Sequence, residues 1–153
     1  MNHHTDLPSL DLFHDRLEVQ LRFNDVDVLG HVNNTVYFSF YDTGKAHYFT
    51  AVRGRSVDWK HVDTVIANVN CAYMAPIFFN EKIEVLTTCL SISEKSFRLL
   101  QMLRETETGE VKSLCETVMV CFDPHSGKSL PVADEMRRQL TDFEGRELSI
   151  HKN

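Results

Sequence analysis

The chain has 153 residues, of which 42% are hydrophobic and 25% charged, a composition typical of a soluble globular protein with one sizeable core. Its net charge of −6 argues against a general nucleic-acid binder, which needs a basic surface. No apolar run approaches the roughly 20 residues of a membrane-spanning helix. Residues 1–15 lack the basic start and apolar stretch of a signal peptide. We therefore expect a cytoplasmic protein without a membrane span.

Residues 16–23 alternate between apolar and polar side chains, after a first segment (1–15) that has no periodicity. The alternation predicts a half-buried strand whose apolar side carries Leu17, Val19, Leu21 and Phe23. We expect residues 1–15 to be a loosely held tail, residues 16–143 to be a single domain, and residues 144–153 to be a C-terminal tail.

A later segment is apolar, aromatic and of helical length. Tyr37, Tyr41 and Tyr48, with Gly44 between them, follow the spacing i, i+4, i+7 and i+11 of one helical face. Further apolar residues lie at other angles, so we expect this helix to be buried on most sides and to end near Gly54. Glycine inside a helix costs roughly 1 kcal/mol relative to alanine. Gly44 therefore predicts that another backbone or a ligand chain approaches the helix closely there.

The turn before this helix is polar and carries the candidate chemistry. Asn33 or Asn34 is suited to cap the helix, because a short carboxamide oxygen can accept from the first free N–H groups. Those N–H groups, at the positive end of the helix dipole, favour a developing oxyanion. Asp25, Asp27 and His31 lie in the same short loop. A carboxylate beside aligned N–H donors is what acyl transfer requires, since one group attacks or deprotonates water while the others hold the carbonyl oxygen.

Four further segments have the composition of strands and are separated by turn residues: about 64–73, 82–93, 97–104 and 111–122. Residues 133–143 can form a short final helix. One strand, a long helix and four strands predict an α+β fold, in which an antiparallel five-stranded sheet wraps around one long central helix. A short chain cannot cover such an apolar helix on all sides, so we expect self-association, usually with two-fold symmetry.

The run DVDVLGHVNNTVY at residues 25–37, followed by Tyr41, Asp42 and Lys45, resembles the hotdog-fold thioesterases, especially the hydroxybenzoyl-CoA-thioesterase-like and acyl-carrier-protein-thioesterase groups. A looser likeness extends to YMAP at residues 73–76 and to the later strands. The resemblance implies a hotdog fold, hydrolysis of acyl-CoA or acyl-carrier-protein thioesters, and a homodimer or homotetramer with active sites at the dimer interface. Asp42 and Lys45 stand where relatives usually carry Glu and Arg.

The same resemblance implies that Asp27 is the catalytic carboxylate, acting as a nucleophile or as a general base. It also implies that backbone N–H groups near Asn33 and Asn34 bind the thioester oxygen. We expect His31 to take part as an orienting group or proton carrier. The full set of expected substrate-binding residues is Gly30, Asn33, Asn34, Tyr37 and Tyr41.

Plainer interpretations compete with these roles. An aspartate in a loop is often a turn former, which is the favoured interpretation of Asp25. Asn33 and Asn34 are equally suited to be helix caps, and the tyrosines to be core aromatics with a hydroxyl handle. The histidine spacings match no closed zinc ligand set, so we expect neither a metal nor a cofactor.

The four cysteines form no CxxC pair, and we expect them to be reduced and mostly buried: Cys71, Cys89, Cys115 and Cys121.

Two rival functions remain open. The chain can be a non-hydrolytic acyl-thioester binder or a hydratase-like relative, in which His31 would act with a carboxylate of the partner chain. It can also be a structural subunit without activity, although the intact set of Asp27, Gly30 and Asn34 argues against that. The sequence does not reveal the acyl group, because pocket depth depends on side-chain packing.

Overall fold

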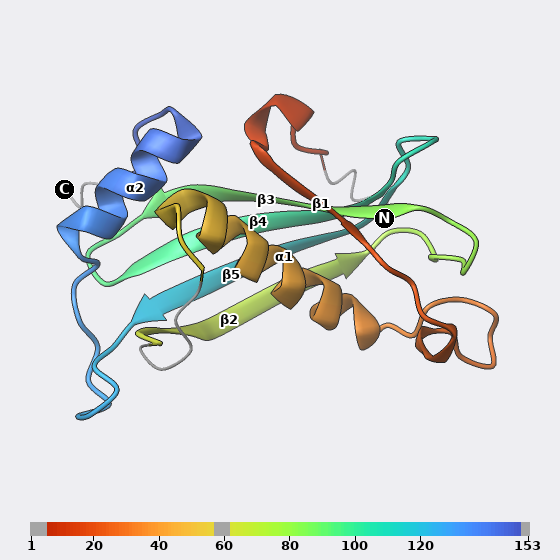
Figure 1. Cartoon of the computed structure of the whole chain (residues 1–153), viewed down its shortest axis with the longest axis horizontal. Helices are drawn as coiled ribbons and strands as arrows, with labels where there is room; N and C mark the ends of the chain where they lie inside the picture. Colours follow the sequence, from red (N-terminus) through yellow and green to blue (C-terminus); the bar gives the residue numbers. More distant parts are fainter. Residues whose placement is uncertain (1–5, 57–61, 151–153) are drawn as a thin grey trace.

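A five-stranded antiparallel sheet and two α-helices make up the computed structural model, which describes residues 6–56 and 62–150 (Figure 1). The strands run in the order β1-β3-β4-β5-β2, and each pair of neighbours is antiparallel. Their bounds are β1 (Asp15–Val19), β2 (Thr64–Tyr73), β3 (Ile83–Ile92), β4 (Ser96–Glu105) and β5 (Val111–Cys121). The helices are α1 (Val36–Arg53) and α2 (Asp134–Glu144). The expected antiparallel sheet is therefore confirmed, and α2 lies within one residue of the short final helix expected at residues 133–143.

Helix α1 lies across the sheet (Figure 1), and its tyrosines are part of the buried core. Tyr37, Tyr41 and Tyr48 are at most 2% exposed. The helix ends as predicted at Gly54, whose φ of 67° is the left-handed conformation common at helix C-termini. The helical spacing in the sequence therefore identified the buried face of α1.

Gly44 marks the point where α1 comes closest to the sheet. A Cβ atom at this position would lie 2.7 Å from Val85 Cγ2 and 3.0 Å from Gln101 Nε2. The Gln101 amide also donates a hydrogen bond of 2.9 Å to the carbonyl of Tyr41 inside the helix. A close approach at Gly44 is therefore present, but the neighbours are side chains of β3 and β4 rather than the backbone or ligand chain that was expected.

The first strand is shorter than predicted, and Phe23 is not part of the core. β1 ends at Val19, and Phe23 lies in a 3-10 helix with 82% of its surface exposed. The Asp25 carboxylate accepts hydrogen bonds from the Arg22 backbone N–H at 2.8 Å and from Arg22 Nη2 at 3.0 Å. This local turn ends the extended conformation before the alternation of the sequence does.

Each terminal segment places one apolar side chain in the core. Phe13 is 5% exposed and packs with Leu86 and Met102. Leu148 is 3% exposed, and its carbonyl accepts a hydrogen bond of 2.8 Å from the Ile92 N–H. The expectation of a loosely held N-terminal tail therefore fails at Phe13, whereas Leu7 and Leu10, earlier in the same segment, are 53% and 36% exposed.

Helix α2 is attached to α1 and β3 through a buried carboxylate. Glu144 accepts hydrogen bonds from the Tyr48 hydroxyl at 2.6 Å, the Thr88 hydroxyl at 2.8 Å and the Cys89 backbone N–H at 3.1 Å. Arg146 lies 3.3 Å away and supplies the opposite charge. These bonds compensate for burying the carboxylate and hold α2 beside the C-terminal end of α1.

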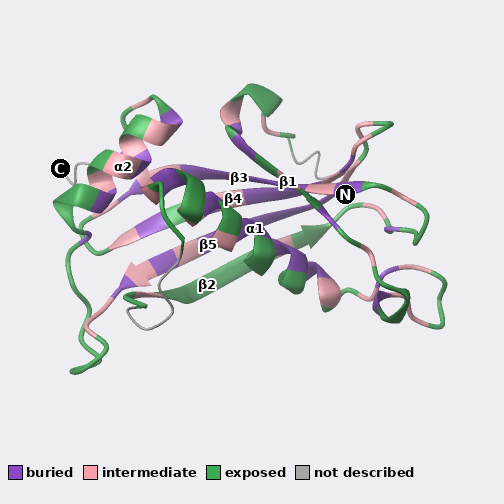
Figure 2. Ribbon diagram, viewed as in Figure 1, coloured by how far each residue is buried: buried purple, intermediate pink, exposed green. Residues whose placement is uncertain are grey.

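Strand β2 forms one edge of the sheet and is largely uncovered (Figure 2). Its exposed apolar residues include Val65, Ile66, Val69 and Tyr73, each at least 39% exposed. An unpaired apolar edge strand is a ready template for pairing with another chain. Among the described residues, neither helix combines the length and the apolar character of a membrane span.

Candidate active site

The polar loop that was singled out in the sequence is closed by its own backbone. Val26 and Val32 form an antiparallel bridge, and the Asp27 N–H donates to the His31 carbonyl at 3.1 Å. The Gly30 N–H returns to the Asp27 carbonyl at 3.1 Å, with a φ of 86° that favours glycine at this position. Val32 ties the loop to the segment before β3 by donating 2.8 Å to the Ile77 carbonyl. The loop is thus a defined turn at the N-terminal end of α1.

Asp27 is held in one orientation within this turn. Its Oδ1 accepts a hydrogen bond of 2.9 Å from the Leu29 backbone N–H, and its Oδ2 lies 3.5 Å from Asn33 Nδ2. The side chain is half-buried. A carboxylate that is oriented by the backbone and still open to the surface can act on a bound substrate.

Asp25, two residues earlier, has a different environment. It is 2% exposed and forms an ion pair with Arg22, and its carbonyl accepts a hydrogen bond of 2.9 Å from the Asn33 N–H. This geometry agrees with its interpretation as a turn former. The two aspartates of the DVD sequence therefore differ in environment: one is a buried anchor and the other is open.

The start of α1 differs from the prediction that Asn33 or Asn34 is the cap. The helix begins at Val36, and Thr35 is the N-cap without a side-chain capping bond. Asn33 lies two residues before this N-cap, and its Oδ1 accepts from the Thr35 N–H at 2.9 Å and from the Thr35 hydroxyl at 2.7 Å. Its carbonyl accepts from the Val36 N–H at 2.9 Å. Asn33 therefore shapes the turn before the helix, whereas Asn34 is exposed.

A surface hollow of about 220 Å³ lies at this end of α1. The residues that line it come from the loop, the helix and the end of β2: His31, Asn34, Tyr37, Tyr73, Met74, Ala75 and Pro76. The rings of Tyr37 and Tyr73 lie 5.0 Å apart and form one wall. Burial raises the pKa of Tyr37 to about 12, so its hydroxyl keeps its proton at neutral pH.

Tyr41 lies beneath this hollow. It is fully buried, and its hydroxyl donates a hydrogen bond of 2.6 Å to Ser113 Oγ on β5. Burial raises its pKa well above the usual value. Tyr41 therefore supports the wall made by Tyr37 and does not reach the surface.

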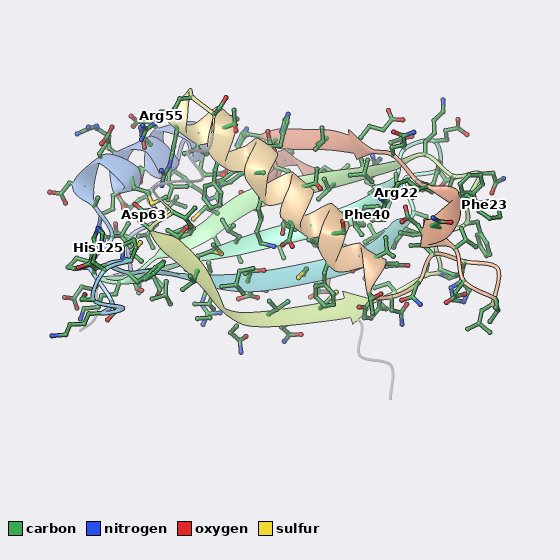
Figure 3. All side chains as sticks on the ribbon, turned by 60° about the horizontal axis from the view of Figure 1, so that its bottom comes forward. Arg22, Phe23, Phe40, Arg55, Asp63 and His125 are labelled. Carbon is green, nitrogen blue, oxygen red and sulfur yellow. The ribbon has the colours of Figure 1, made fainter. Side chains whose placement is uncertain are left out.

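The structure brings some of the predicted site residues together and separates others. His31, Asn34 and Tyr37 line the hollow. Asp27, Gly30 and Asn33 belong to the same loop as His31 but are not among the lining residues, and Tyr41 is buried in the core. The turn that carries Arg22 and Phe23 lies at this same end of α1, whereas Arg55, Asp63 and His125 lie at the opposite end (Figure 3).

Tyr73 and Met74 also line the hollow, and sequence reasoning assigned them no role. The family resemblance of the YMAP segment at residues 73–76 could have indicated their role. Only the fold, however, places the end of β2 next to the turn that precedes α1.

Comparisons with known proteins show the family to which the chain belongs. The model of the thioesterase-like superfamily matches residues 21–140. The long-chain acyl-CoA thioesterase FadM of Escherichia coli is 25% identical over 126 residues, which cover 80% of this chain and 94% of FadM.

Solved structures of thioesterases have the same fold as this chain. A Thermus thermophilus thioesterase bound to coenzyme A and zinc superposes with a TM-score of 0.81 at 28% identity, covering 91% of this chain and 100% of that one. A mutant 4-hydroxybenzoyl-CoA thioesterase bound to 4-hydroxybenzoyl-CoA shares the fold, with a TM-score of 0.73 at 16% identity over 82% of this chain and 97% of that one. The chain therefore belongs to the thioesterase-like superfamily and is a thioester hydrolase with the hotdog fold.

Proposed function

We propose that this enzyme hydrolyses acyl-CoA or acyl-carrier-protein thioesters with Asp27 as the catalytic carboxylate. The observation that carries the proposal is the orientation of Asp27, whose Oδ1 accepts the Leu29 N–H in the turn that leads into α1. Similarity to FadM, and to a thioesterase bound to coenzyme A, supports CoA as the carrier.

The chemistry follows from the polarity of the helix start. The first N–H groups of an α-helix have no partner within the helix, and the dipole makes this end positive. In our proposal the thioester oxygen accepts from backbone N–H groups near Asn33 and Asn34 other than those of Thr35 and Val36, which already donate to Asn33. The negative charge of the tetrahedral intermediate is stabilised there.

Asp27 has two possible roles in this scheme. It attacks the carbonyl carbon and forms an anhydride that water then cleaves, or it takes a proton from the attacking water. In both routes the carbon–sulfur bond breaks and the thiol leaves. His31 positions the carboxylate, since its carbonyl accepts the Asp27 N–H at 3.1 Å.

The substrate-binding residues have distinct parts in this proposal. Gly30 allows the tight turn that brings Asp27 toward α1, and Asn33 holds that turn against Thr35. Asn34 and Tyr37 contact the substrate at the hollow, while Tyr41 supports Tyr37 from below.

A second copy of the chain completes the site in this proposal. The hollow at the end of α1 is shallow and adjoins β2, whose apolar edge is uncovered. Pairing of two β2 edges about a two-fold axis would cover these residues and place a partner surface over the hollow. The resulting assembly is a homodimer or a pair of homodimers.

Free thiol release from a panel of acyl-CoAs and acyl-carrier proteins tests the proposal. Aliphatic and aromatic acyl groups of increasing size belong in the panel, and product analysis by mass spectrometry distinguishes hydrolysis from hydration of an unsaturated acyl chain. Thiol release that requires Asp27 is the expected result. Hydration without thiol release would favour the hydratase-like alternative, and binding without turnover would favour a carrier or scaffold role.

A further inference from the structure

Cys71 and Cys115 face each other across strands β2 and β5. They are direct register partners, so their side chains point to the same face of the sheet. Cys115 belongs to the core cluster that contains Tyr41 and Val85, and Cys71 packs against that cluster. Both thiols therefore lie between the sheet and α1, outside the residues assigned to thioester hydrolysis.

The backbone hydrogen bonds identify which kind of strand pair this is. The Met74 N–H donates to the Lys112 carbonyl at 2.9 Å, which marks a hydrogen-bonded pair at the end of β2. Paired positions alternate along an antiparallel ladder, so Cys71 and Cys115 form a non-hydrogen-bonded pair. In such a pair the Cα atoms are about 4.5 Å apart, which lies within the range of about 4.4–6.8 Å found in disulfides. The backbone already has a spacing that a cross-strand disulfide can use.

The surroundings of the two thiols differ in a way that suits sequential oxidation. Cys71 Sγ lies 3.5 Å from Ser113 Oγ and faces the thiol of its register partner Cys115, and the Lys45 ammonium, which is 8% exposed, adds a positive charge nearby. The neighbouring Cys115 thiol is the largest cause that lowers the pKa of Cys71, the Ser113 hydroxyl and the charge of Lys45 lower it further, and burial opposes this shift. The Cys71 sulfur, together with burial, raises the pKa of Cys115. Cys71 is therefore the more acidic and more nucleophilic thiol of the pair.

The more acidic thiol, Cys71, is also the more accessible to solvent. Cys71 is half-buried, whereas Cys115 is 1% exposed. A small oxidant in solution therefore meets the nucleophilic sulfur before the second thiol.

We propose that Cys71 and Cys115 form a thiol oxidation site, which hydrogen peroxide converts into a disulfide that links β2 to β5. The Cys71 thiolate attacks one peroxide oxygen, the oxygen–oxygen bond breaks, and the leaving hydroxide takes up a proton to form water. The sulfenic acid on Cys71 is then attacked by the Cys115 sulfur, which loses its proton as the sulfur–oxygen bond breaks and a second water leaves. Two thiols are oxidised by two electrons, and one peroxide is reduced to two waters.

The other two cysteines provide an internal contrast. Cys89 faces Leu99 and Cys121 faces Thr64, so neither has a cysteine as its register partner. Burial raises the pKa of Cys89 to about 12 and raises that of Cys121 as well. They are therefore expected to remain thiols under conditions that oxidise Cys71. The inference does not rest on the proposed hydrolysis, since the oxidation is measured without an acyl substrate.

Hydrogen peroxide added to the reduced wild-type protein tests the site. After treatment the protein is denatured, its free thiols are alkylated and counted, and peptides are mapped by mass spectrometry. We expect free thiols to fall from four to two per chain, a single linked peptide pair that contains Cys71 and Cys115, and full recovery with dithiothreitol. Cys71 should react at least about 10-fold faster than Cys121.

Three variants sharpen the result. Cys115→Ser should stop at the sulfenic acid on Cys71, which dimedone traps, and Cys71→Ser should leave Cys115 reduced. Cys121→Ser, on the same strand as Cys115, is the matched control and should form the disulfide as the wild type does.

Peroxide treatment that leaves both Cys71 and Cys115 free would overturn the inference, and so would a disulfide between the Cys71 residues of two chains. The wild-type peptide map decides the question even where a serine variant folds poorly.

Discussion

The Tyr73 hydroxyl donates a hydrogen bond of 3.0 Å to the Asn34 carbonyl, and so joins the end of β2 to the turn that leads into α1. The Tyr73 ring also packs against Tyr37 with their centroids 5.0 Å apart. One side chain of an edge strand thus helps to hold the N-terminal end of the helix, where we propose that the thioester oxygen binds.

Tyr73→Phe should therefore weaken hydrolysis while keeping the fold. The ring remains to pack on Tyr37, but the bond to Asn34 is lost, and a lost hydrogen bond of this kind is worth about 1 kcal/mol, or about a 5-fold fall in kcat/KM. Steady-state kinetics on the best acyl-CoA measure this fall. Thr43→Val, on the exposed surface of α1, is a control that removes a side-chain hydrogen bond away from the hollow. Equal kinetics for Tyr73→Phe and wild type would show that the bond does not support the site.

Asp27→Asn should lower thioester hydrolysis by at least about 100-fold, because the variant has neither a nucleophilic nor a basic oxygen at that position. The amide oxygen can still accept the Leu29 N–H, so the loop and the thermal unfolding midpoint should change little. Asp42→Asn, an exposed carboxylate on α1, is the matched control and should retain turnover. Near-normal turnover by folded Asp27→Asn would rule out the catalytic assignment.

Asp25→Asn, in contrast to Asp27→Asn, should mainly lower the stability of the protein. Its carboxylate is 2% exposed and accepts two hydrogen bonds from Arg22, so losing the charge should lower the free energy of unfolding by about 1.5–3 kcal/mol. Urea titration followed by circular dichroism measures the change. A variant as stable as wild type would mean that the ion pair with Arg22 does not stabilise the loop.

Gly44→Ala should destabilise the protein by about 1–3 kcal/mol through overpacking. The new Cβ would lie 2.7 Å and 2.9 Å from the two methyl carbons of Val85, a short side chain that cannot swing away easily. This clash outweighs the gain in helix propensity of roughly 1 kcal/mol.

A second substitution tests the cause of that loss. Val85→Ala removes the opposing methyl groups, so Gly44→Ala should be much less harmful in the Val85→Ala background, and the two effects should not add. Chemical denaturation of the four proteins in this cycle gives the coupling. Additive losses would show that the contact with Val85 is not what makes glycine necessary.

The protein should be a homodimer or homotetramer at micromolar concentration, as sedimentation velocity can measure. Val69→Lys places a charge on the uncovered part of β2, where the wild-type side chain is 39% exposed, and should shift the protein toward the monomer. Leu130→Lys, an equally exposed position after β5, is the control and should leave the assembly unchanged. A wild-type protein that sediments as a clean monomer would contradict the proposed completion of the site by a second copy.

The sequence alone determined the kinds of elements and the location of the chemical loop. Helical spacing of Tyr37, Tyr41 and Tyr48 identified the buried face of α1, and the four later strands begin and end within about two residues of their predicted bounds. These features are local, because periodicity and turn residues act over a few positions along the chain. The run of residues 25–37 was likewise sufficient to indicate the family.

The tertiary structure decided which residues that are distant in the sequence contact each other. Phe23 continued the apolar alternation but is exposed, because the bonds between Arg22 and Asp25 end the strand first. Tyr73 meets Asn34, and Cys71 meets Cys115, only because β2 is placed at the sheet edge beside β5. These pairs are separated by about 40 positions in the sequence. Strand order and register depend on the packing of the whole sheet against α1, and no local pattern of residues contains that information.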